Sequence, residues 1–97
     1  MKEENIIKEN ADYRAGICLF KKSDALLFLR NNAGKNVNIL GIDGFILNNI
    51  AIQPSLENSV DFSTKNISMK DSFVCAEEFL KDKDENMYFE IVYRQVI

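Results

Sequence analysis

The chain has 97 residues and a formal net charge of −3, with 12 basic side chains, 15 acidic side chains and no histidine. Its length suits one domain over residues 1–97, because compact domains run to about 100–150 residues. An apolar fraction of 46% beside 28% charged residues predicts a packed core and argues against disordered, collagen-like and coiled-coil classes. The acidic balance argues against a general nucleic-acid binder, which needs clustered Lys and Arg to contact phosphates.

The residue types that carry most enzyme chemistry are missing from this sequence. Histidine, the usual general base and metal ligand near neutral pH, is absent. Cys18 and Cys75 form no CxxC unit, so we expect neither a thioredoxin-like motif nor a zinc site and interpret both as small buried hydrophobes. The chain also lacks a GxSxG elbow and the glycine-rich phosphate-binding patterns. We therefore expect no catalytic residue, no metal and no cofactor.

The sequence predicts a cytoplasmic protein with reduced thiols and no membrane contact. No apolar run approaches the ~20 residues that cross a bilayer. The first ten residues, MKEENIIKEN, lack the apolar stretch of a secretory signal. They are compatible with either a short amphipathic turn or a frayed end.

The first predicted elements are a strand and a helix. Residues 13–20 end in a continuous apolar run that is typical of a central strand shielded on both faces. The spacing then predicts a helix over 24–33, with Ser23 or Asp24 as its N-cap. Gly34 is expected to close that helix in a left-handed conformation.

Residues 37–52 predict a hairpin whose turn has two candidate positions. An alternating segment leads to Asp43-Gly44, a pair that readily takes the positive φ values of a two-residue turn. The competing interpretation places the turn at Asn48–Asn49, with 45–47 pairing 50–52. Both turns together would give three short strands, and the pattern alone does not choose the register.

Residues 53–67 contain Pro54 and several Ser, Asn and Thr residues, which predicts a loop with at most a short strand at 60–63. Loops longer than about 12–15 residues are uncommon in compact domains unless they serve a purpose. This segment is therefore the first candidate for a recognition surface.

The last two elements have the clearest local signals. Ser68 to Asp71 resembles a capping box, and the apolar spacing that follows predicts a helix over 69–81. Residues 87–97 alternate as a strand does. One face of that strand is expected to carry Met87, Phe89, Ile91 and Tyr93, and the other Tyr88, Glu90, Val92 and Arg94.

The order strand, helix, strand, strand, helix, strand predicts an α+β fold. We expect an antiparallel or mixed sheet of four to five strands with two helices on one face. A ferredoxin-like arrangement has this order of elements.

Acidic side chains are unevenly distributed along the chain. Residues 36–64 contain Asp43, Glu57 and Asp61 but no Lys or Arg, and Glu77 and Glu78 begin a second acidic cluster. Turn residues and solvated helix faces also explain such patterns, and nothing places a buried carboxyl beside an exposed one as an acid–base pair requires. Negative potential on more than one edge would steer a basic partner to fast association.

Three segments, LGIDGF (40–45), QPSLE (53–57) and SVDFS (59–63), resemble small immunity proteins of bacterial polymorphic-toxin and contact-dependent growth inhibition systems. The resemblance covers about a quarter of the chain. It implies a cytoplasmic protein that binds one cognate toxin domain, often a nuclease, and covers its active or substrate-binding surface. The residues expected to contact the toxin are Asp43, Leu56, Glu57, Asp61, Glu77 and Glu78.

Two other functions remain open at this point. The first is a ferredoxin-like homo-oligomeric regulatory or ligand-binding module that associates through its last strand, which exposure of Tyr88, Val92 and Val96 would favour. The second is a small enzyme that works through carboxylates. The sequence does not decide the oligomeric state.

Overall fold

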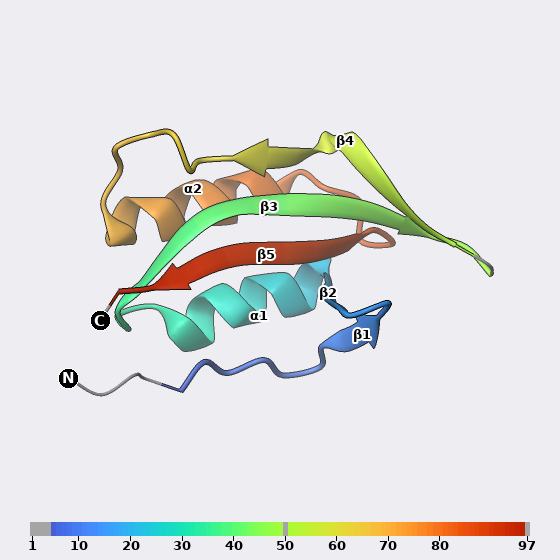
Figure 1. The fold of residues 1–97 in the computed structure, drawn as a ribbon, viewed down its shortest axis with the longest axis horizontal. Coiled ribbons are helices and arrows are strands. Elements are labelled where there is room, and N and C mark those ends of the chain that lie inside the picture. The colour runs from blue at the N-terminus through green and yellow to red at the C-terminus, as the bar shows by residue number, and fades with distance from the viewer. Residues whose placement is uncertain (1–4, 50, 97) are drawn as a thin grey trace.

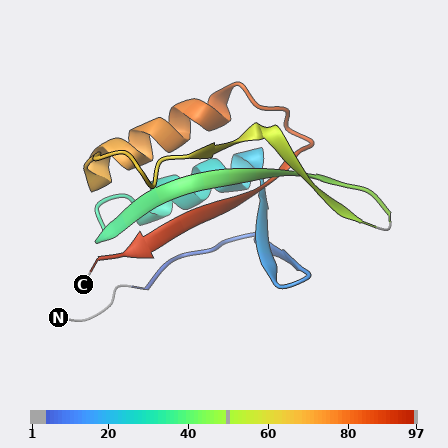
Figure 2. The same ribbon diagram turned by 45° about the horizontal axis from the view of Figure 1, so that its top comes forward.

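Five strands and two helices build the described part of the chain, residues 5–49 and 51–96 of this computed structural model. The elements in chain order are β1 (Asp12–Arg14), β2 (Ile17–Lys21), α1 (Lys22–Asn32), β3 (Val37–Leu47), β4 (Ile52–Asp61), α2 (Met69–Lys81) and β5 (Tyr88–Gln95). Both helices lie on one face of the sheet and leave the other face open (Figures 1 and 2). The predicted α+β class is confirmed.

The sheet is antiparallel throughout, with the strand order β1-β2-β5-β3-β4. Helix α1 joins β2 to β3 across β5, and α2 joins β4 to β5 across β3, which gives two interleaved split β-α-β units. The order of elements after β1 is that of a ferredoxin-like fold. The central strands differ, because β3 and β5 lie in the middle here, whereas the first and third strands of the unit do so in a ferredoxin-like sheet.

The single strand predicted over 13–20 is wrong in one respect, because the chain turns back within it. Ala15 and Gly16 have φ values of 51° and 78°, which suit a two-residue hairpin turn between β1 and β2. Strand β2 then pairs with β5 only at Phe20 and Lys21. It is therefore not the central strand, shielded on both faces, that its apolar run suggested.

Helix α1 starts earlier than predicted and without either expected cap. Lys21 occupies the N-cap position and makes no side-chain capping hydrogen bond. Asp24 lies inside the helix, where its carboxylate accepts a hydrogen bond from Asn10 Nδ2 at 3.1 Å. The left-handed conformation predicted for Gly34 is confirmed by its φ of 86°.

The β3–β4 hairpin turns at the later of the two candidate positions. Asp43 and Gly44 lie inside β3, so the turn predicted there is wrong. Leu47 pairs with Ile52, and Asn48 closes the connection by donating its N–H to Ala51 O at 3.1 Å. Residue 50, which one interpretation paired with this strand, lies outside the described residues.

The loop predicted over 53–67 is largely a strand. Strand β4 covers Ile52–Asp61 at the edge of the sheet. Pro54 has no N–H to donate, and an edge strand tolerates this because no further strand pairs with its outer side. Its register with β3 jumps from Ser55 opposite Gly44 to Val60 opposite Ile42. Residues 56–59 therefore form a bulge of four residues without register partners in β3. The polar residues that predicted a loop belong to this edge strand and its bulge.

Helix α2 and strand β5 match their predictions. Ser68 is the N-cap of α2 and its hydroxyl accepts the Asp71 N–H at 3.0 Å. In β5, Phe89 and Ile91 are buried under the helices, as the alternation indicated. Local capping and period-2 alternation are therefore sufficient signals for these two elements.

The core lies between the helices and the covered face of the sheet. Two polar side chains, Asn32 and Ser72, are also buried there and both are hydrogen-bonded. Cys18 and Cys75 are half-buried beside the core, so the expectation of full burial is met only in part. The buried apolar members of the core are Phe20, Ala25, Phe28, Leu29, Val37, Ile39, Ile42, Phe62, Ala76, Leu80, Phe89 and Ile91.

Neither helix in the described residues is long and apolar enough to cross a membrane.

Candidate protein-binding surface

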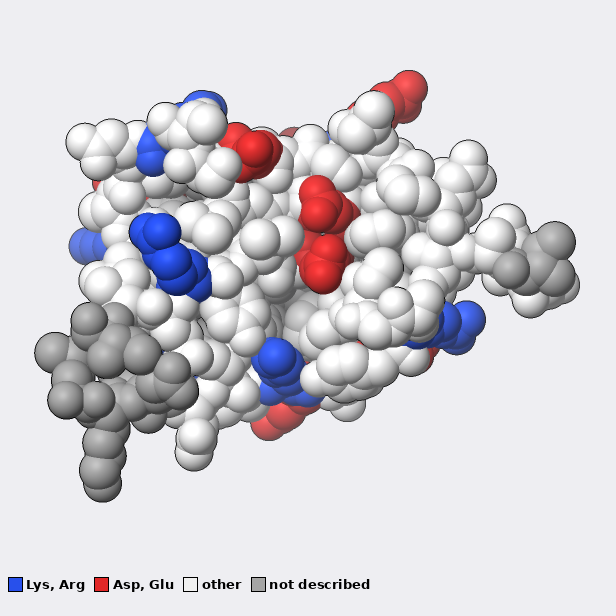
Figure 3. All heavy atoms as spheres, viewed as in Figure 1, with Lys and Arg blue, Asp and Glu red and all other residues white. Residues whose placement is uncertain are grey.

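The open face of the sheet carries two carboxylates directly opposite each other. Ile42 and Ile91 are buried under the helices, so the residues beside them in β3 and β5, Asp43 and Glu90, point to the open face. Asp43 and Glu90 are partners in the β3–β5 register, and side chains in such pairs have Cβ atoms about 4.5–5.5 Å apart. Figure 3 shows acidic side chains gathered near the middle of this face, with the visible basic side chains further out.

A third carboxylate lies in the next strand. Asp61 of β4 is the register partner of Gly41, and Asp43 and Asp61 both line one hollow of about 290 Å³. No basic side chain lines this hollow, whose walls are Leu40, Gly41, Asp43, Val60, Asp61, Ser63 and Val92. Two of the six predicted contact residues, Asp43 and Asp61, therefore line the same hollow, and Glu90 faces Asp43.

The carboxylates differ in their protonation chemistry. Partial burial raises the pKa of Glu90, and the charge of Asp43 raises it further. Hydrogen bonds from Ser63 instead lower the pKa of Asp61, whose Oδ1 accepts the Ser63 N–H at 2.8 Å. Like charges opposite each other in a sheet are destabilising, and the Asp43 charge is the second cause of the raised pKa of Glu90, after burial.

The charges on this face have no neutralising partner among the described residues. The ion pairs found in residues 5–49 and 51–96 are Arg14–Asp12 and Lys81–Glu77, and both lie elsewhere. Arg94 is also on the open face, but it lies opposite Asn38, four residues along β5 from Glu90. The described residues also contain no group of three acidic or cysteine side chains able to hold a metal ion. Because neither ion pair involves Asp43, Asp61 or Glu90, these carboxylates can form ion pairs with basic side chains of another molecule.

The β4 bulge presents two more of the predicted contact residues. Leu56 is 89% exposed, and Glu57 beside it is exposed too. The bulge is held in place because Ser59 Oγ accepts the Gly44 N–H at 3.0 Å and donates to Ser55 O at 2.8 Å. Gly44 is required here, since a Cβ at this position would collide with the carbonyl oxygen of Asn58.

The β3–β4 hairpin extends from the body of the molecule as an arm (Figures 1 and 2). No residue from 44 to 56 is charged. Ile46 is exposed on this arm, and the cross-strand partners Leu47 and Ile52 are half-buried. The arm therefore carries exposed apolar surface beyond Asp43 in β3, and Leu56 adds an exposed apolar side chain on the edge strand β4.

Glu77 and Glu78 do not join the other predicted residues. They are exposed on α2, in the layer of helices, and Glu77 forms an ion pair of 3.6 Å with Lys81. The two acidic clusters of the sequence thus belong to different surfaces of the molecule.

Glu90 is the acidic residue that sequence reasoning missed. Its orientation opposite to Phe89 and Ile91 was predictable from the alternation of β5. Its pairing with Asp43 was not, because that contact requires β5 to lie beside β3. Of the residues that bear on self-association, Val92 and Val96 are exposed and Tyr88 is half-buried.

Comparison of this chain with protein-family models, curated proteins and solved structures finds no match, so its function must be inferred from the surface itself.

Proposed function

We propose that this protein is an immunity protein, which binds a cognate bacterial toxin domain in the cytoplasm and neutralises it without performing a reaction of its own. The toxin surface it covers would be basic, as the active or substrate-binding surface of a nuclease is. The observation that carries the proposal is the facing pair Asp43 and Glu90, which has Asp61 beside it and no cation within ion-pair distance among the described residues.

Unneutralised carboxylates favour a partner that supplies positive charge. Lys or Arg of a toxin, brought to this face, would relieve the repulsion between Asp43 and Glu90. That relief would make the free energy of binding more favourable. Charged groups of this kind raise the association rate constant by steering the encounter.

Apolar contacts would supply the rest of the affinity. Interfaces depend on a few anchors surrounded by polar groups, and an almost fully exposed leucine is suited to fill a pocket on a partner. Leu56 and the uncharged arm, which continues β3 beyond Asp43, provide such anchors. Glu57 would contribute at the rim of the same interface.

The test uses the full chain and the product of the neighbouring gene, which the immunity proposal expects to be the toxin. Association and dissociation rate constants are measured for the wild type and for Asp43→Asn/Asp61→Asn/Glu90→Gln, over a range of ionic strength. We expect the association rate constant of the wild type to fall steeply with salt, and the triple variant to associate about tenfold or more slowly at low salt. Leu56→Ser should mainly accelerate dissociation.

The matched control is Glu77→Gln/Glu78→Gln, which neutralises charge on α2 and should leave the association rate constant nearly unchanged. A toxicity-rescue assay in cells gives the functional readout. Complete protection by the triple variant, with unchanged rate constants, would sink the acidic-face mechanism, and a failure to co-purify with the neighbouring gene product would sink the immunity function.

A second candidate function is a homo-oligomeric module, favoured by the exposed Val92 and Val96 on the open face. Strand β5 lies inside the sheet, paired with β3 along its length and with β2 at its start, so such association would use its face and not its edge. The solution mass of the isolated protein separates this candidate from the first.

A further inference from the structure

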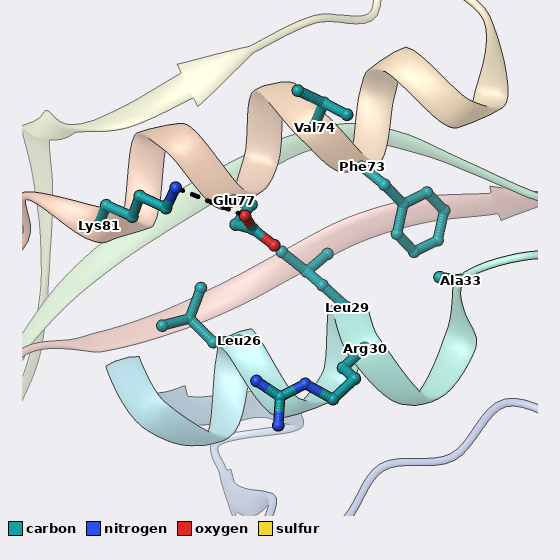
Figure 4. A pocket seen from close by; sticks show the side chains of 8 residues that line it. All are labelled: Leu26, Leu29, Arg30, Ala33, Phe73, Val74, Glu77 and Lys81. Atoms are coloured by element: carbon teal, nitrogen blue, oxygen red, sulfur yellow. Dashed lines mark ion pairs between the residues drawn. The ribbon is translucent and has the colours of Figure 1, made fainter.

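The outer surface of the helical layer contains a groove that the proposed function does not use. One hollow of about 430 Å³ lies between α1 and α2, and a second of about 520 Å³ adjoins the end of α1. The two share Ala33, Phe73 and Val74, so they form one continuous groove. Figure 4 shows Leu26 and Leu29 projecting from α1 toward α2 into the first hollow.

The apolar lining of the groove has helical spacing on both sides. Leu26 and Leu29 are three residues apart on α1, with Ala33 directly after the end of that helix, and Met69 and Phe73 are four residues apart on α2. Val74 is 50% exposed and Met69 is 37% exposed, so the apolar surface is open to solvent. From Met69 to Lys81 the lining residues of α2 span about 18 Å at 1.5 Å per residue, slightly more than three helical turns.

The rim of the groove is basic although the whole chain is acidic. Its charged lining residues are Arg30, Lys35, Lys70, Lys81 and Glu77. The one acid among them, Glu77, is already engaged by Lys81 at 3.6 Å. The open face of the sheet has the opposite character, since the hollow there is lined by two carboxylates and no cation.

We propose that this groove binds an amphipathic helix of a partner protein, with apolar side chains at helical spacing on one face and Asp or Glu along its flanks. Ridges on such a helix would fit between those of α1 and α2, as a third helix packs onto two others. The acidic flanks would meet Arg30 and Lys70. The positive charge of the rim favours an acidic partner, whereas the open face would bind a basic toxin. The groove is therefore a site independent of the proposed function.

The probe is a 15-residue helical peptide with leucines on one face and glutamates beside them, titrated into the ¹⁵N-labelled full chain. The matched probe keeps the leucines and replaces each glutamate with lysine. We expect the amide resonances of Ala33 and Val74 to shift with the acidic peptide, which should bind at least tenfold more tightly than the basic one at low salt. That ratio should narrow as added salt screens the rim.

Variants locate the site. Val74→Asp and Arg30→Glu should each weaken binding of the acidic peptide about tenfold, whereas Val92→Asp, an equivalent change on the open face, should leave it unchanged. If Val74→Asp alters the circular dichroism spectrum, that variant is misfolded, and the effect of Arg30→Glu at an exposed position then decides whether the peptide binds in the groove. Equal affinity for both peptides, shifts confined to the open face, or no shifts would each overturn the proposal. Concentration-dependent shifts of the groove without peptide would also overturn it, because a second copy would then occupy the groove.

Discussion

The covered and open faces of the sheet are built from alternate residues of the same strands, and they treat polar side chains in opposite ways. On the covered side, Ser72 of α2 is buried against β3, where its hydroxyl accepts the Ile39 N–H at 3.0 Å and donates to Met69 O at 2.6 Å. On the open side, Asp43 and Glu90 face each other with no cation within ion-pair distance among the described residues. The first arrangement stabilises the fold, while the second costs stability, which the proposed basic partner would restore.

The largest expected effect on stability comes from removing a buried side chain on the covered face of the sheet. Phe89→Ala removes a fully buried ring at the centre of the core and should lower the free energy of unfolding by about 3–5 kcal/mol. The matched control, Val92→Ala, lies on the other face of the same strand at 36% exposure and should cost less than about 1 kcal/mol. Urea unfolding measures both, and equal losses would contradict the assignment of the two faces.

The next effect concerns the buried hydroxyl. Ser72→Ala leaves the Ile39 N–H without its acceptor inside the core, which should cost about 1–3 kcal/mol. Alanine is the better helix former, so a loss of stability would come from the orphaned amide and not from helix propensity. Ser23→Ala, an exposed change in the first turn of α1, should alter the unfolding free energy by no more than about 0.5 kcal/mol.

The bulge that presents Leu56 depends on a missing side chain. Gly44→Ala would place a methyl group against the carbonyl of Asn58, so β4 must shift, at a cost of about 1–2 kcal/mol. We expect the amide resonances of Asn58 and Ser59 to move more than those of α2. Uniform small shifts with unchanged stability would show that the bulge adapts freely.

The smallest effect is the pH dependence of the open face. Because the pKa of Glu90 is raised in the folded state, the protonated form favours folding at low pH, and that contribution is lost as pH rises through the folded pKa. Glu90→Gln should therefore be more stable than the wild type at neutral pH, by less than about 1 kcal/mol given partial solvent screening. The difference should vanish below the ordinary glutamate pKa of about 4.3.

Carboxyl-carbon NMR titration reports the cause directly. In Asp43→Asn the pKa of Glu90 should fall but remain above its ordinary value, because burial is the larger contribution. A Glu90 pKa that does not respond to Asp43→Asn would show that the two carboxylates do not interact.

Prediction from sequence succeeded where the signal was local. The Ser68 cap and the alternation of β5 depend on residues a few positions apart, and both elements appear where expected. It failed where a distant partner decided the outcome. Asp43-Gly44 has turn chemistry, but both residues pair with β5, and Gly44 also pairs with Ser55 of β4, which keeps them extended. The segment predicted as a loop similarly becomes a strand because β3 pairs with residues 52–55 and with Val60 and Asp61 of β4, on either side of the bulge.

The candidate surface divides along the same line. The excess of carboxylates and the absence of histidine follow from residue types alone, whereas the exposure of Leu56 does not, because leucine is usually buried. That Asp43, Asp61 and Glu90 come together while Glu77 and Glu78 lie on the helical layer follows from the strand order β5-β3-β4. Composition and periodicity act within a few residues, whereas the neighbours of a strand are chosen by which apolar faces can be buried together. Only the assembled sheet could therefore decide which charges meet.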